Sequence, residues 1–138
     1  MIANVSLGLE EARRALDLVV AEVSRRGKAV AAAVADPHGE LIALVRMDGA
    51  PLPSIAIVAN KAWTAARSGK PSADIEKRAL TDPAFDIAFY GDPRFCGWGG
   101  GVPIFHEGKL AGSLAVSGLP TEEDIEVATL VATALAAS

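Results

Sequence analysis

The sequence has one cysteine and two histidines, and this scarcity excludes several kinds of scaffold and site. A disulfide joins two cysteines, so Cys96 cannot form one within the chain. No cysteine or histidine pair has the spacing of a zinc site, and we therefore expect no structural metal.

Aromatic residues make up only 5% of the chain, although 51% of its residues are hydrophobic. Alanine and valine supply the excess, so we expect a thin core in which helices and sheet pack closely. No stretch reaches the roughly 18 apolar residues of a membrane-spanning helix, and the N-terminus lacks the pattern of a signal peptide. We therefore expect a cytoplasmic protein that has no membrane partner.

The chain also lacks an excess of basic residues. It has 13 Lys and Arg against 17 Asp and Glu, which gives a net charge of −4. Its arginine pairs, Arg13-Arg14 and Arg25-Arg26, share an expected helix with acidic residues, which is typical of a solvated helix face. Affinity for a phosphate backbone depends on clustered Lys and Arg, so we expect no nucleic-acid partner.

Hydrophobic periodicity and turn residues predict one domain over residues 1–138. The expected elements are a helix over 9–26, a hairpin over 28–46, a helix over 54–69, a short helix over 72–82, a hairpin over 102–117 and a helix from Thr121. The order is therefore α-ββ-α-α-ββ-α. These elements predict an α+β fold in which a central antiparallel sheet of four to five strands carries packed helices.

The helix expected over residues 54–69 carries a polar stripe on an otherwise apolar surface. We expect Ser54 to be its N-cap and Gly69 to end it. Lys61 and Thr64 lie one turn apart, so either they form a pocket floor or Lys61 reaches solvent while Thr64 bonds back to a carbonyl.

Polar residues from three regions suggest a pocket for a small-molecule ligand. Its candidate residues are Arg46 and Asp48 after the first hairpin, Lys61 and Thr64 on the helix, and the amides of Gly99, Gly100 and Gly101. Cations and amides suit a carboxylate or an enolate, and the aromatic side chains of residues 84–101 suit a flat ring. Alternatively, Arg46 pairs with Asp48 and the glycines only permit a tight bend. We expect Lys61 to contact Asp48 or an anionic ligand.

Four stretches, spread over nearly the whole chain, form a recognisable set. They are residues 35–41 (ADPHGEL) with 46–50 (RMDGA), residues 60–65 (NKAWTA), residues 100–104 (GGVPI), and residues 112–118 with Asp124. Taken together, they resemble the GlcG/HbpS family, which also includes the C-terminal domain of PduO-type cobalamin adenosyltransferases.

The resemblance implies an α+β domain that assembles into homo-oligomers such as octamers. Several members of the family bind haem or related tetrapyrroles. Haem iron usually takes an axial ligand such as histidine, but both His38 and His106 lie in expected hairpin turns rather than on a pocket-facing element. His106 is the better candidate because it adjoins the glycine loop.

Three functions stay open at this point. The first is a haem-binding or tetrapyrrole-binding module. The second is a small enzyme that acts on a carboxylate or enolisable substrate through Lys61 or Asp48, although no complete catalytic constellation is visible. The third is an oligomeric accessory protein without a ligand. In each case we expect self-association, because the alanine-valine helices offer more apolar surface than one thin sheet covers.

Overall fold

The computed structural model describes residues 1–137, and their elements follow the predicted order. The elements are α1 (Leu9–Arg25), β1 (Ala31–Ala35), β2 (Leu41–Arg46), α2 (Ser54–Ser68), α3 (Ser72–Thr81), the 3-10 helix η1 (Ile87–Tyr90), β3 (Gly101–His106), β4 (Lys109–Ser117) and α4 (Thr121–Ala136). The predicted α+β class and element order are thus confirmed. None of the helices within these residues is long and apolar enough to cross a membrane.

The two hairpins join into one antiparallel sheet with the strand order β2-β1-β4-β3. Pairing of β1 with β4 places Ala31 opposite Ser117 and makes these two strands the centre of the sheet. Every residue of β1 is buried, as its uninterrupted apolar sequence predicts. Strands β2 and β3 form the two edges.

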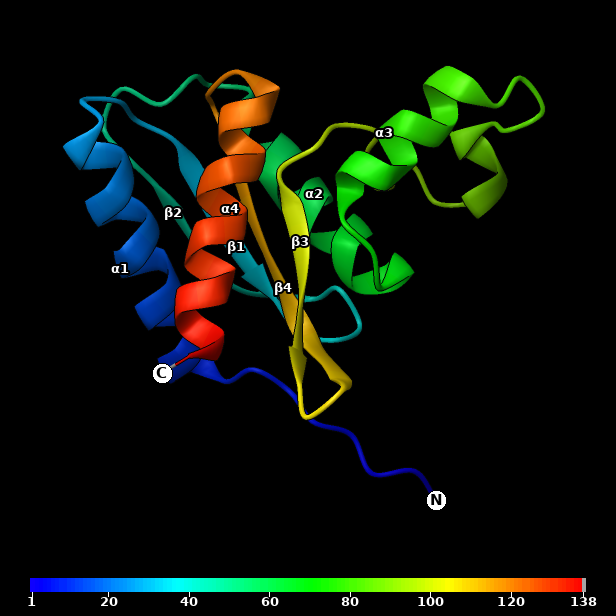
Figure 1. Cartoon of the computed structure of the whole chain (residues 1–138), viewed down its shortest axis with the longest axis horizontal. Helices are drawn as coiled ribbons and strands as arrows, with labels where there is room; N and C mark the ends of the chain where they lie inside the picture. The colour runs from blue at the N-terminus through cyan, green and yellow to red at the C-terminus, as the bar shows by residue number, and fades with distance from the viewer. Residues whose placement is uncertain (138) are drawn as a thin grey trace.

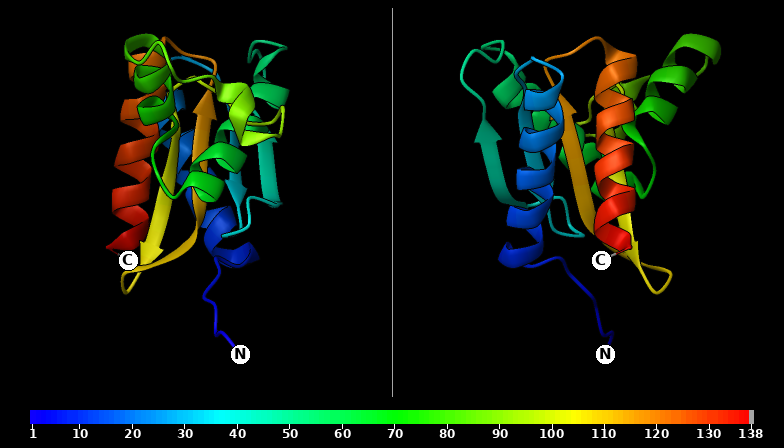
Figure 2. Two further views of the ribbon diagram at one scale, coloured as in Figure 1. Left: turned by 90° about the vertical axis from the view of Figure 1, so that its right-hand side faces the viewer. Right: turned by 60° about the vertical axis from the view of Figure 1, so that its left-hand side comes forward.

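Helices cover both faces of this sheet (Figures 1 and 2). Helices α1 and α4 pack against the face that carries Ala32 and Val34 of β1. Helix α2 packs against the other face, to which β1 contributes only the small side chains of Ala31, Ala33 and Ala35. Because alanine projects little beyond the backbone, α2 lies close to the sheet.

Helix α2 begins differently from the prediction. Ser54 is its first helical residue rather than its N-cap, and no side chain caps this end. The reason is that Pro53 already has a helical backbone, with φ −65° and ψ −18°, so the turn begins before Ser54. The other end is as predicted, since Gly69 has the left-handed φ of 66° that ends many helices.

Residues 72–98, here called the aromatic arm, project from the body of the molecule (Figure 1). Ring contacts organise the arm: Tyr90 stacks on Phe95 with centroids 4.1 Å apart, and Phe85 meets Tyr90 edge-on at 6.1 Å. Other apolar side chains of the arm are exposed to solvent, with Leu80 at 80% and Phe89 at 75%. The predicted aromatic loop is therefore partly ordered by its own rings.

Candidate functional site

Lys61 is buried and has protein partners. Only 2% of the residue is exposed. Its Nζ donates to the carbonyl oxygen of Val116 at 3.0 Å and to Oδ2 of Asp124 at 3.1 Å. Asp124 lies in the first turn of α4, where its Oδ1 accepts the N–H of Leu119 at 3.0 Å. The ion pair therefore links α2 and α4, which cover opposite faces of the sheet.

The expected contact of Lys61 with Asp48 is wrong, because the contacting carboxylate belongs to Asp124. Asp48 is exposed in the loop after β2, so its charge is solvated. Burial raises the pKa of Asp124, while the ammonium of Lys61 and the amide of Leu119 act in the opposite direction. The charge of Asp124 therefore depends on Lys61 remaining beside it.

The amides of the triple glycine are largely engaged by the protein. The N–H of Gly99 donates to Oε2 of Glu76 at 2.9 Å, and the N–H of Gly101 donates to Oγ of Ser72 at 2.9 Å. Both acceptors belong to α3. These bonds fix the start of β3 to α3, and they leave neither amide available to an anion.

Gly100 and Gly101 allow the backbones around Lys61 to approach one another. A Cβ on Gly100 would lie 2.9 Å from Nζ of Lys61 and 2.6 Å from the carbonyl oxygen of Val116. A Cβ on Gly101 would clash with the carbonyl oxygen of Lys61. The space beside the ammonium is therefore filled by main chain, which favours the alternative in which the glycines only permit a tight bend.

Thr64 is also buried, one turn from Lys61. Its Oγ1 accepts the N–H of Cys96 at 2.8 Å and donates to the carbonyl oxygen of Arg94 at 3.3 Å. Thr64 thus fastens the end of the aromatic arm to α2, rather than bonding back to its own helix. Burial raises the pKa of the Cys96 thiol, which favours its unreactive protonated form.

Arg46 and Asp48 form no ion pair with each other, and neither shares the buried surroundings of Lys61. Both are exposed, Arg46 at the end of edge strand β2 and Asp48 in the following loop. No ion pair within 4 Å joins them in the described part of the chain, so the alternative in which Arg46 pairs with Asp48 is absent there. The structure therefore brings together Lys61, Thr64 and the glycines, but not the residues from the first hairpin.

His106 does not adjoin the glycine loop, because it is the last residue of β3 and Gly101 is the first. Its side chain is 66% exposed, and its Nε2 lies 3.9 Å from Oε1 of Glu107. His106 is thus exposed, as expected of a turn histidine, and it also lines a cavity at this end of the sheet. His106 belongs to β3 rather than to the predicted turn, because β3 extends one residue further than predicted.

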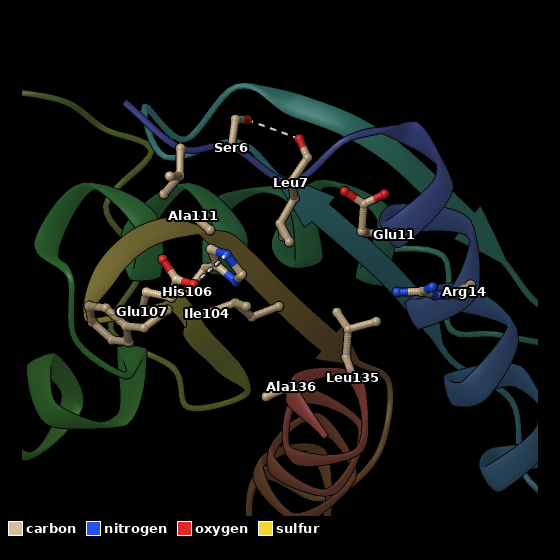
Figure 3. A pocket seen from close by; sticks show the side chains of 12 residues that line it. Ser6, Leu7, Glu11, Arg14, Ile104, His106, Glu107, Ala111, Leu135 and Ala136 are labelled. Atoms are coloured by element: carbon tan, nitrogen blue, oxygen red, sulfur yellow. Dashed lines mark hydrogen bonds and ion pairs between the residues drawn. The ribbon is translucent and has the colours of Figure 1, made fainter. Parts of the chain in front are cut away.

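This cavity, here called the His106 cavity, has a volume of about 540 Å³ (Figure 3). Its apolar walls and charged rim come from the N-terminal segment, α1, the β3–β4 hairpin and the end of α4: Val5, Ser6, Leu7, Glu11, Arg14, Ile104, Phe105, His106, Glu107, Ala111, Leu135 and Ala136. The N–H of Leu7 donates to the carbonyl oxygen of Ala111 at 2.8 Å, which holds the N-terminal segment over β4.

The sequence contained one signal for this cavity. The interior glycine of the second hairpin, Gly112, predicts a close approach, and the approaching group is Leu7, whose Cδ1 would lie 2.8 Å from a Cβ at that position. Among the wall residues, Arg14 was expected on the solvated face of the first helix, and Glu11 lies three residues before it on the same helix. Both sit on a helix remote in sequence from His106, so spacing alone does not place them together.

Comparison with known proteins gives consistent matches over most of the chain. The family model for haem-degrading, HbpS-like proteins matches residues 7–133. A 15.0 kDa protein from the dhaT-dhaS intergenic region of Citrobacter freundii is 28% identical over 124 residues, which cover 89% of this chain and 86% of that protein. A double mutant of Streptomyces reticuli HbpS is 27% identical, with a TM-score of 0.87 over 98% of this chain and 90% of the other. PduOC, solved as a haem complex, shares the fold at 23% identity, with a TM-score of 0.86 over 94% of this chain and 95% of PduOC.

Proposed function

The chain belongs to the HbpS-like family, and we propose that it binds haem or a related tetrapyrrole in the His106 cavity. The observation that carries this proposal is a histidine at the wall of a cavity of about 540 Å³. That volume lies within the roughly 300 to 1,000 Å³ typical of small-molecule sites. The haem complex of PduOC supports the choice of ligand.

The residues of the cavity fit a haem group. His106 offers an imidazole nitrogen, which is a common axial ligand of haem iron. The walls from Leu7, Ile104 and Leu135 suit an apolar macrocycle, and the guanidinium of Arg14 suits a carboxylate at its edge. When bound, haem supplies an iron centre that undergoes redox chemistry and binds further ligands.

We assign Lys61, Thr64 and the three glycines to the stability of the fold rather than to the ligand. Hydrogen bonds from Lys61 to Val116, from Cys96 to Thr64 and from Gly101 to Ser72 support this assignment. The alternative enzyme, acting on a carboxylate or enolisable substrate, would work through Lys61 or Asp48, and neither residue lines the His106 cavity. Their different surroundings, one buried and one exposed, favour the binding function.

Replacing His106 by Ala is expected to remove or strongly shift the Soret band of the haem-loaded protein, because the variant loses the imidazole that contacts iron. Ferric haem titrated into the purified protein and followed by absorbance measures this change. His38→Ala is the matched control, since His38 is the chain's other histidine and does not line the cavity. A spectrum and affinity unchanged in His106→Ala would reject His106 as the ligand.

The aromatic arm supports a further proposal, that the chain forms homo-oligomers. Leu80, Phe89 and Trp98 are 80%, 75% and 54% exposed, and exposed large apolar side chains on one projecting segment suit a surface that another subunit covers. We expect light scattering at micromolar concentration to give the mass of an oligomer. We also expect Phe89→Ser to shift the protein toward smaller species. A stable wild-type monomer would contradict this proposal.

A further inference from the structure

Arg14 faces the His106 cavity without an acidic partner. It lies on α1 across the cavity from His106, with Leu7, Ile104 and Leu135 between them (Figure 3). Among the described residues, Arg14 makes no hydrogen bond and no ion pair within 4 Å. An arginine in this state has all five N–H donors available to a ligand.

The two acidic residues that line the His106 cavity with Arg14, Glu11 and Glu107, have other contacts or positions. Oε1 of Glu11 accepts the N–H of Gly8 at 3.1 Å, so this carboxylate caps the N-terminus of α1. Glu107 lies beside His106 on the opposite wall, 3.9 Å from its Nε2. The α1 wall of the cavity therefore presents an unpaired guanidinium next to an already engaged carboxylate.

We infer that Arg14 recognises a carboxylate of the cavity ligand, and that the cavity therefore selects acidic macrocycles over neutral ones. This inference rests on the proposed function. The wall from Leu7, Ile104 and Leu135 accommodates an apolar body between a nitrogen donor at one end and a cation at the other. A planar apolar molecule with a central metal and a peripheral carboxylate matches that order of groups. Arginine suits the task because its fork binds both oxygens of a carboxylate.

The test compares two ligands that share the macrocycle and the iron and differ at the propionate groups, namely iron protoporphyrin IX, which carries free carboxylates, and its dimethyl ester. Each is titrated into wild-type protein and Arg14→Gln, and the affinity is measured by absorbance. We expect Arg14→Gln to bind the free acid about tenfold more weakly, which is the scale of one charge-assisted hydrogen bond. Its affinity for the ester is expected to equal that of the wild type, because the ester carries no carboxylate.

Arg13→Gln is the matched control, since Arg13 is the neighbouring exposed arginine on α1 and does not line the cavity. It is expected to bind both ligands as the wild type does. An Arg14→Gln variant that binds the acid normally, or that loses acid and ester equally, would overturn the inference while leaving the proposed function intact. A wild type that binds neither ligand would overturn the proposed function, and the inference with it.

Discussion

Replacing Asp124 by Asn is expected to lower the free energy of unfolding by about 3 to 5 kcal/mol, the usual cost of removing one partner from a buried ion pair. The variant leaves the ammonium of Lys61, which is 2% exposed, without its compensating charge. Asparagine keeps an oxygen that can accept the N–H of Leu119, so the effect reports on the charge rather than on the start of α4. Urea denaturation of wild type and variant measures the difference.

The double variant Lys61→Met/Asp124→Asn is the control for this experiment. Methionine has a shape similar to the lysine stem and needs no counterion, so the double variant is expected to recover much of the stability lost in Asp124→Asn. A single variant within about 0.5 kcal/mol of the wild type would contradict the burial of this pair, because changes of that size are typical of surface substitutions.

Replacing Gly101 by Ala is expected to cost about 3 kcal/mol of unfolding free energy, the upper range for overpacking a core. The added Cβ would meet the carbonyl oxygen of Lys61 and lie 3.1 Å from Oγ of Ser72. The first of these atoms is main chain within α2, so it cannot rotate away, and relief requires α2 to move from the sheet. Denaturant unfolding detects the loss.

Gly97→Ala provides the matched control, because its Cβ would lie 3.8 Å from the nearest atom, a side-chain carbon of Ile87. We expect its stability to match the wild type within about 0.5 kcal/mol. If the two substitutions had equal effects, the loss would come from replacing any glycine in this region. It would not come from the close approach of α2 to β3.

The elements of the fold were predictable because local residues mark their ends. Gly39 has a φ of 91° in the first hairpin turn, and Gly69 has a φ of 66° after α2. A positive φ favours glycine because glycine has no Cβ, so a glycine at a chain reversal marks such a position in the sequence itself. The error at Ser54 is of the same local kind, since a serine before an apolar helix resembles an N-cap whether or not its backbone has already turned.

The partner of Lys61 was not predictable from such local signals. Asp124 lies 63 residues further along the chain, and an acidic residue in the first turn of a helix already has a local explanation in the helix dipole. The same holds for Arg14, which is indistinguishable from a solvated residue until the fold brings the N-terminal segment and the β3–β4 hairpin to the same cavity as α1. Tertiary packing, rather than residue type, distinguishes a buried ion pair from a solvated charge.

A haem titration of Lys61→Met/Asp124→Asn beside His106→Ala tests the central claim most directly, namely that the ligand occupies the His106 cavity and the Lys61 pair serves the fold. We expect the double variant, once shown to be folded, to bind haem with wild-type affinity and a wild-type Soret band, and we expect His106→Ala not to do so. The opposite result would contradict this claim: a folded double variant that has lost haem binding, together with a His106→Ala variant that retains it. The ligand site would then lie at Lys61.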